Sequence, residues 1–190
     1  MKKISIALIC LFGILNISCS STKNVLAHTL KEKQINKTDL VFFDSKEYDS
    51  NGNLIFEKWD DGYECKYFYD ENNKLVSSEQ NTGITTEFFY MNDDLVLEQW
   101  SDGMLKIYTY QNGKLIKENY SETAFTEYFY DENGNEIYYT SSTGTTSWNE
   151  YNDDNLLIYR KNSKGEQYFF DYEFWDNGNI KKRINYKLNK

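Results

Sequence analysis

The sequence has no proline, one histidine and three cysteines. Proline is depleted in strands, and its absence beside 17 tyrosines and 12 phenylalanines favours a single all-β unit. The lone histidine, His28, precedes the repetitive part of the chain, so a Ser-His or Cys-His catalytic pair is not expected. On this basis we do not expect the chain to be an enzyme.

The sequence also lacks an apolar run long enough to span a membrane, since Ile4 to Leu15 is too short. That run follows two lysines and precedes small residues, which is the order of a secretory signal. Ser18-Cys19 resembles a bacterial lipobox, although Asn16 stands where a leucine is more usual. The resemblance implies removal of residues 1–18 and lipidation of Cys19, with ordinary cleavage and secretion as the alternative. The chain is therefore predicted to be exported and lipid-anchored in the cell envelope, at the outer membrane or surface.

Positive charge is scarce, because 21 basic residues stand against 30 acidic ones, for a formal net charge of -9. Loss of Lys2 and Lys3 with the signal would change that charge to -11. An acidic surface repels nucleic acid and anionic lipid headgroups. We therefore expect no nucleic-acid partner, and membrane contact only through the N-terminal lipid.

Cysteine usage excludes an internal disulfide. Cys10 would be removed with the signal and Cys19 would carry lipid, which leaves Cys65 as the only thiol. Cys65 lies in the apolar-rich segment Tyr63 to Tyr69, where burial as a small hydrophobic residue is expected. Stability is then expected to come from packing and strand pairing alone.

The main feature present is a repeat of 20 or 21 residues, in which an aromatic anchor precedes a turn. A fixed period of this size is typical of stacked repeats. A second turn, usually containing glycine, falls half a period later, as at Asp61-Gly62. Asn112-Gly113 is expected to supply the two positive φ values of a type I′ hairpin. The anchors are Tyr48, Tyr69, Tyr90, Tyr110, Tyr130, Tyr151 and Trp175.

Each unit reads as two short strands, which predicts an all-β meander of about thirteen strands in tandem hairpins of ~21 residues. Tyr67 and Tyr69 point to one face and Phe68 to the other, so a flat sheet would leave one apolar surface wet. The antiparallel sheet is therefore expected to curl, twist or meet a second layer. About seven units are expected to be too few for a closed shell.

Three segments are expected along the chain. Residues 1–18 are the signal peptide, and residues 19–40 form a lipid-anchored polar tether in which Leu26 to Ile35 can make a weak helical turn. Residues 41–190 form a single β-repeat domain, expected to be a monomer. The basic cluster Lys181-Lys182-Arg183 is expected to solvate a last, unpaired strand.

Two families share parts of this repeat. Tyr69-Asp70-Glu71-Asn72-Asn73-Lys74-Leu75 resembles the Tyr-Asp repeats of RHS proteins, as does Tyr130-Asp131-Glu132-Asn133-Gly134-Asn135. That resemblance covers roughly residues 41 to 185 and implies a long spiralling β-sheet, which wraps into a shell in large members. The chain departs from it because asparagine or lysine replaces the arginine usual after the glycine. Tyr110 to Leu115 is similar to units of variant MORN-repeat proteins, some of which are antitoxin components. Neither resemblance brings catalytic residues or a cofactor to this chain.

Three aromatic residues are the candidate ligand-binding positions. Trp59, Trp100 and Tyr120 share one phase of the repeat, just before the second turn, which predicts that they lie along one edge of the array. Aromatic residues at such an edge can stack on sugar rings or anchor a protein partner. The alternative is that they close the core where strands end.

Catalytic and metal-binding readings find less support. Glu87 and Glu127 occupy the same phase and would form a carboxylate pair only if neighbouring units brought them together; solvated charges on a strand face are the alternative. Acidic turns such as Asp49-Ser50-Asn51-Gly52-Asn53 are explained by hairpin chemistry, so no metal or cofactor is predicted.

The sequence as a whole predicts a non-catalytic exported lipoprotein whose hairpin array binds a protein or glycan. The alternative is an immunity or antitoxin-type protein, or a weak carbohydrate-active enzyme.

Overall fold

The computed structural model describes residues 24–189, which form one antiparallel sheet and a short helix. The signal and lipidation predictions, Cys19 included, lie outside these residues. The elements are α1 (Val25–Lys33), η2 (Lys37–Asp39), β1 (Leu40–Tyr48), β2 (Leu54–Trp59), β3 (Glu64–Tyr69), β4 (Leu75–Gln80), β5 (Thr85–Met91), β6 (Asp94–Trp100), β7 (Leu105–Gln111), β8 (Lys114–Asn119), β9 (Phe125–Tyr130), β10 (Glu136–Ser141), β11 (Thr146–Tyr151), β12 (Leu157–Asn162), β13 (Gln167–Phe174) and β14 (Ile180–Leu188).

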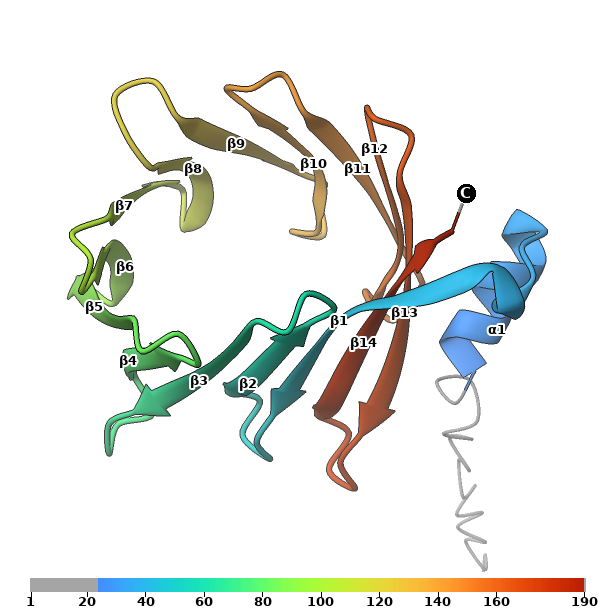
Figure 1. Ribbon diagram of the computed structural model, residues 1–190, viewed down its shortest axis with the longest axis horizontal. Helices are drawn as coiled ribbons and strands as arrows, with labels where there is room; N and C mark the ends of the chain where they lie inside the picture. The colour runs from blue at the N-terminus through green and yellow to red at the C-terminus, as the bar shows by residue number, and fades with distance from the viewer. Residues whose placement is uncertain (1–23, 190) are drawn as a thin grey trace, which may run out of the picture.

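The sheet closes into a barrel. Each strand pairs antiparallel with its neighbours in sequence, and β1 pairs with both β2 and β14, so the first and last strands join (Figure 1). The predicted all-β meander of hairpins is confirmed. The expectation that so few units cannot close is wrong, and so is that of an unpaired last strand, because β14 is bonded on both sides.

A β-bulge in every repeat explains the closure. In seven hairpins the register shifts beside the anchor, as between Phe68 and Tyr69 and between Thr109 and Tyr110. A bulge bends its strand and increases the local twist. Because the bend recurs at the same place in each unit, the bends add up and roll the sheet onto itself.

Turn chemistry follows the sequence at most hairpins. Asn112 and Gly113 have φ values of 52° and 73°, which confirms the predicted two-residue type I′ turn. Asn92 and Asp93 form a second turn of this kind, with φ values of 50° and 69°. We call the barrel end with the turns after the anchors the first-turn end, and the opposite one the second-turn end.

The last anchor differs from its prediction. Trp175 lies in the turn rather than in β13, and its N–H bonds the carbonyl of Asn179, as the N–H of Asp49 bonds that of Asn53. By register, Phe174 is the residue opposite the start of the next strand. β13 has eight residues where most strands have six or seven, so the repeat period is broken at this point.

Four anchor tyrosines and Tyr172 make the same long-range hydrogen bond. Each tyrosine hydroxyl donates to the backbone carbonyl fifteen residues earlier, at the start of the preceding hairpin's second strand. The bonds are Tyr69 to Leu54 (2.9 Å), Tyr90 to Leu75 (2.8 Å), Tyr130 to Leu115 (2.8 Å), Tyr151 to Glu136 (3.0 Å) and Tyr172 to Leu157 (2.7 Å). In the last unit this contact is therefore made by Tyr172 and not by the predicted anchor, Trp175.

The two faces of the sheet differ in character, as the alternation of Tyr67, Phe68 and Tyr69 predicted. Tyrosine hydroxyls on the inner face bond glutamates ten residues earlier: Tyr67 to Glu57 at 2.6 Å, Tyr128 to Glu118 at 2.8 Å, and Tyr108 to Glu98. On the outer face Phe68, Phe89 and Phe129 are 41–48% exposed. The inner face of the barrel is therefore lined by polar and aromatic side chains rather than by aliphatic ones.

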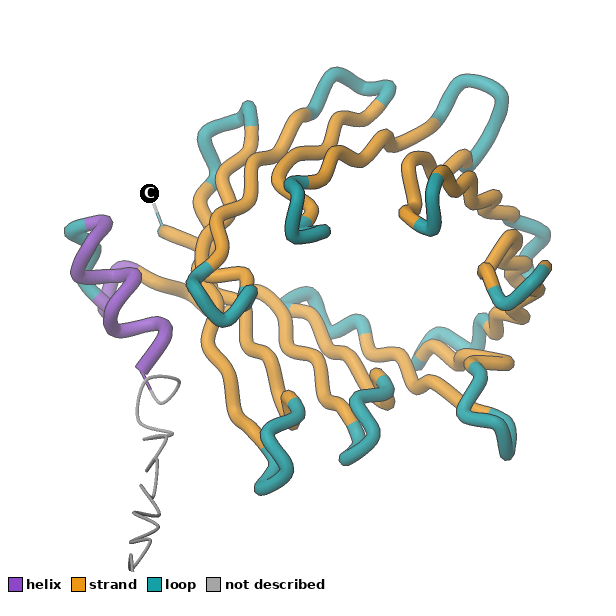
Figure 2. The backbone as a smooth tube through the Cα atoms, turned by 180° about the vertical axis from the view of Figure 1, so that it is seen from behind, coloured by secondary structure: helices purple, strands orange, loops and turns teal. Residues whose placement is uncertain are grey.

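Helix α1 docks on the outside of the barrel, against β12 and β13 (Figure 2). Leu26 and Leu30, one turn apart, pack on Tyr159 and Phe169, and all four are buried. Lys33 adds an ion pair to Glu150 at 2.7 Å. From residue 24 on, the segment expected as a polar tether is thus part of the folded unit. Within the described residues no helix is long and apolar enough to cross a membrane.

Candidate functional site inside the barrel

A pocket of about 270 Å³ lies inside the barrel near its second-turn end. Its walls come from β10, from β12 to β14, and from β1 and β2, so it straddles the seam where the two ends of the chain meet (Figure 1). Closure of the sheet therefore creates this site, because no open array would bring β2 beside β13.

A bulge in β1 builds the aromatic wall of the pocket. The register shifts between Phe42 and Asp44, and the extra residue, Phe43, turns toward the lumen. Its ring centroid lies 5.3 Å from that of Trp59 and 5.0 Å from that of Tyr168. These three rings give the pocket a broad apolar surface.

Polar atoms without partners face the same space. Asp44 and Asn185 are cross-strand neighbours, and the Asn185 amide donates to Asp44 Oδ2 at 2.9 Å. Among the described residues, Asp44 Oδ1 and Asn185 Oδ1 accept no hydrogen bond, and Arg183 Nε and Trp59 Nε1 donate none. Two acceptors and two donors are thus buried around one pocket, although a buried polar group normally finds a partner.

Both arginines of the chain line this pocket. Arg160 and Arg183 lie on either strand neighbouring β13, with guanidinium carbons 6.0 Å and 5.7 Å from the ring centroid of Phe170. Arg160 Nε donates to Asn149 Oδ1 at 2.7 Å. Within residues 24–189 neither guanidinium has a carboxylate oxygen within 4 Å.

The charge balance of the pocket is positive. Lys46 also lines it, but its ammonium is paired with Glu57 at 3.0 Å. The remaining lining charges are the two guanidinium groups and Asp44. Burial raises the pKa of the Asp44 carboxyl, an effect opposed by the Asn185 hydrogen bond and the nearby charge of Arg183. An acidic chain therefore holds a locally cationic cavity.

The three predicted binding aromatics do lie at the second-turn end, but they do not act together. Trp59 is a wall of the pocket. Trp100 and Tyr120 instead surround Lys106, whose Nζ lies 5.6 Å from each ring centroid and 3.4 Å from Glu98 Oε2. That second cluster is filled by the chain's own ammonium group.

The fold does not bring together the residues of the carboxylate pair considered from the sequence. Glu87 on β5 and Glu127 on β9 are four strands apart, about 19 Å around the sheet. Glu127 is instead bonded to Lys117 at 3.2 Å. No group of three metal-ligating side chains occurs between residues 24 and 189. Cys65 is 3% exposed, which confirms its predicted burial.

Sequence reasoning missed most of the site. Arg183 was assigned with Lys181 and Lys182 to a solvated edge, yet β14 is paired on both sides and Lys182 bonds Glu47 of β1 at 2.9 Å. A usable signal was present, because arginine is so rare in a chain with 21 basic residues. Two isolated arginines among lysines suggest positions where the fork-shaped guanidinium is needed.

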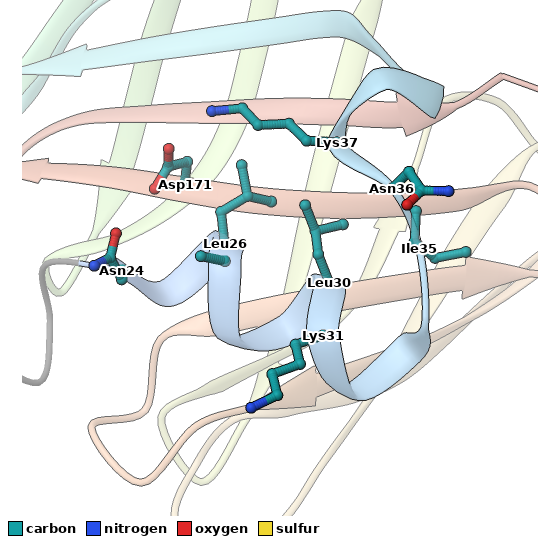
Figure 3. A pocket seen from close by; sticks show the side chains of 9 residues that line it. Asn24, Leu26, Leu30, Lys31, Ile35, Asn36, Lys37 and Asp171 are labelled. Atoms are coloured by element: carbon teal, nitrogen blue, oxygen red, sulfur yellow. The ribbon is translucent and has the colours of Figure 1, made fainter.

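An outer hollow is a weaker candidate. It measures about 390 Å³ and lies beside α1, where its lining includes Leu26, Leu30 and Ile35 together with Asp171 of β13 (Figure 3). Its apolar lining belongs to the contact of the helix with the barrel. None of the buried polar atoms that lack partners in the described part of the chain lies there.

Comparison with known proteins adds little beyond the fold. No family model and no curated protein matches the sequence. Among solved structures, the chain is similar to a TcdB2-TccC3-Cdc42 crystal structure, with 15% identity and a TM-score of 0.33 over 75% of this chain and 9% of that one. For a TcdB2-TccC3 crystal structure the values are 12%, 0.32, 77% and 9%. The chain spans less than a tenth of these chains, and at such TM-scores the likeness carries no argument about function.

Proposed function

We propose that this chain is a non-catalytic exported lipoprotein that binds a small polar ligand of glycan type inside its barrel. The observation that carries the proposal is the pocket at the seam, where four buried polar atoms lack partners beside three aromatic rings. A sugar offers hydroxyl groups that both donate and accept, together with C–H faces that pack on aromatic rings. The volume of the pocket, about 270 Å³, lies just below the roughly 300 Å³ at which pockets for drug-sized ligands begin. A smaller ligand, such as a single sugar ring, therefore suits it.

The test is a glycan array probed with the chain from residue 20 on, followed by titration of each hit with isothermal calorimetry as the measurement. Trp59→Phe should weaken a genuine hit, because it removes the indole N–H and reduces the aromatic wall. The matched control is Trp148→Phe, a position on the outer face that is 47% exposed and does not line the pocket. Equal effects of both changes, or an array without a saturable hit, would reject a ligand site in the lumen.

Export and anchoring form the second part of the proposal and rest on the sequence before residue 24. We expect the wild-type chain to fractionate with membranes and to incorporate labelled fatty acid. Cys19→Ala should abolish both while leaving the barrel folded, as circular dichroism would verify. Unchanged membrane association of Cys19→Ala would contradict lipid anchoring.

A further inference from the structure

Arginine placement narrows the class of ligand. Arg160 projects from β12 and Arg183 from β14, and Phe170 of β13 lies between them. Both guanidinium groups therefore reach one region of the lumen from two separate strands. Guanidinium binds planar oxyanions through two parallel N–H bonds, which lysine cannot reproduce.

The protein does not neutralise these two groups itself. Within the described residues, nine ion pairs involve lysine or histidine and none involves arginine. The charge of Arg183 acts to lower the pKa of the Asp44 carboxyl, and that of Arg160 acts to lower the pKa of the Glu136 carboxyl, but neither carboxylate forms an ion pair with its arginine. Arg183 Nε is buried and donates to no protein atom. Both arginines are half-buried, so their guanidinium groups lose part of their hydration without gaining a close counter-ion, and an anionic ligand would offset that loss.

Resting on the proposed function, we propose that Arg160 and Arg183 form a carboxylate subsite and that the ligand is an acidic monosaccharide unit of the uronic-acid class. The carboxylate lies between the two guanidinium groups. The ring packs on Phe43 and Trp59, and its hydroxyls bond the free oxygens of Asp44 and Asn185. The unpartnered atoms of Asp44, Arg183 and Asn185 and the positive charge of the pocket then have one common explanation.

The first test asks whether the protein distinguishes charged from neutral sugars. It uses the wild-type chain from residue 20 on, because that chain keeps the whole barrel and its docked helix. Galacturonate and glucuronate are titrated against galactose and glucose, with isothermal calorimetry as the measurement. The uronates should bind about tenfold or more tightly than the neutral hexoses, and their affinity should fall as salt rises. Neutral hexoses binding equally well would overturn the carboxylate subsite while leaving the proposed function intact. Failure of all four sugars would count against both proposals.

Two arginine substitutions provide the second test. Arg183→Gln and Arg160→Gln should each weaken uronate binding by about tenfold or more and leave neutral-hexose binding unchanged. Lys66→Gln is the matched control, because it removes the same charge from an exposed position on the outer face. Inorganic phosphate serves as a competitor. If phosphate binds at the arginines while uronates do not, the subsite is anionic but the sugar assignment is wrong.

Discussion

Tyr69→Phe isolates the hydrogen bond that recurs between repeats. The hydroxyl of Tyr69 donates to the Leu54 carbonyl at 2.9 Å, and the substitution removes this bond while keeping the ring. A typical intramolecular hydrogen bond contributes about 0.5–1.5 kcal/mol net, so the free energy of unfolding should fall by about 1 kcal/mol. For a chain of this size that loss lowers Tm by roughly 2–4 °C.

Tyr110→Phe is the matched control for this measurement. Tyr110 is an anchor at the same place in its own repeat and is also half-buried, yet within the described residues its hydroxyl makes no such bond. Its loss of stability should be below about 0.3 kcal/mol. Urea unfolding of both variants, with m-values compared to the wild type, supplies the two free energies. Equal losses for Tyr69→Phe and Tyr110→Phe would refute the role assigned to the bond.

Two further predictions concern closure and pH. Deleting one interior unit, such as residues 70–90, should destabilise the protein by more than the roughly 3–5 kcal/mol that is typical of losing a core aromatic residue. The reason is that the barrel must then close with two strands fewer. If urea unfolding shows a smaller loss of stability, the repeats behave as an open array whose units contribute additively. Hydrogen bonds from Lys187 and Asn162 lower the pKa of Glu166 from 4.5 to about 2. The stabilisation from this carboxylate is therefore present above pH 4.5 and is lost as pH falls toward 2, so Glu166→Gln should flatten that part of the stability profile, and an unchanged profile would contradict the assignment.

The sequence predicts local features well and the closed ring poorly. The turn at Asn112-Gly113 and the opposite faces of Tyr67 and Phe68 depend on nearest neighbours, so their patterns are visible in a few residues. Closure depends on a bulge in each of the seven hairpins at the first-turn end, and no residue pattern found in the sequence marks all of those bulges. The helix α1 was visible only as a weak pattern, because its burial depends on Tyr159 and Phe169 far along the chain.

The candidate site shows the same division. Trp59 was found from its place in the repeat, whereas Asp44 and Asn185 were missed because they meet only across the seam. Arg183 was misassigned because the strand that carries it was taken for a free edge. Residues that the repeat does not share, rather than those it does, make up most of the pocket.

The seam also fixes an order of events in folding. β1 and β14 are joined by contacts between residues that are far apart in the sequence. Lys182 and Glu47 are separated by 135 positions, and Asn185 and Asp44 by 141. Hairpins form from local contacts, but a pairing over such a distance must wait for the last strand, because loop closure becomes slower and more costly with length. The pocket therefore does not exist until β14 has been synthesised and has paired with β1. Ligand binding would then detect only the closed barrel, and a fragment that ends before β14 would not bind the ligand even if its hairpins had folded.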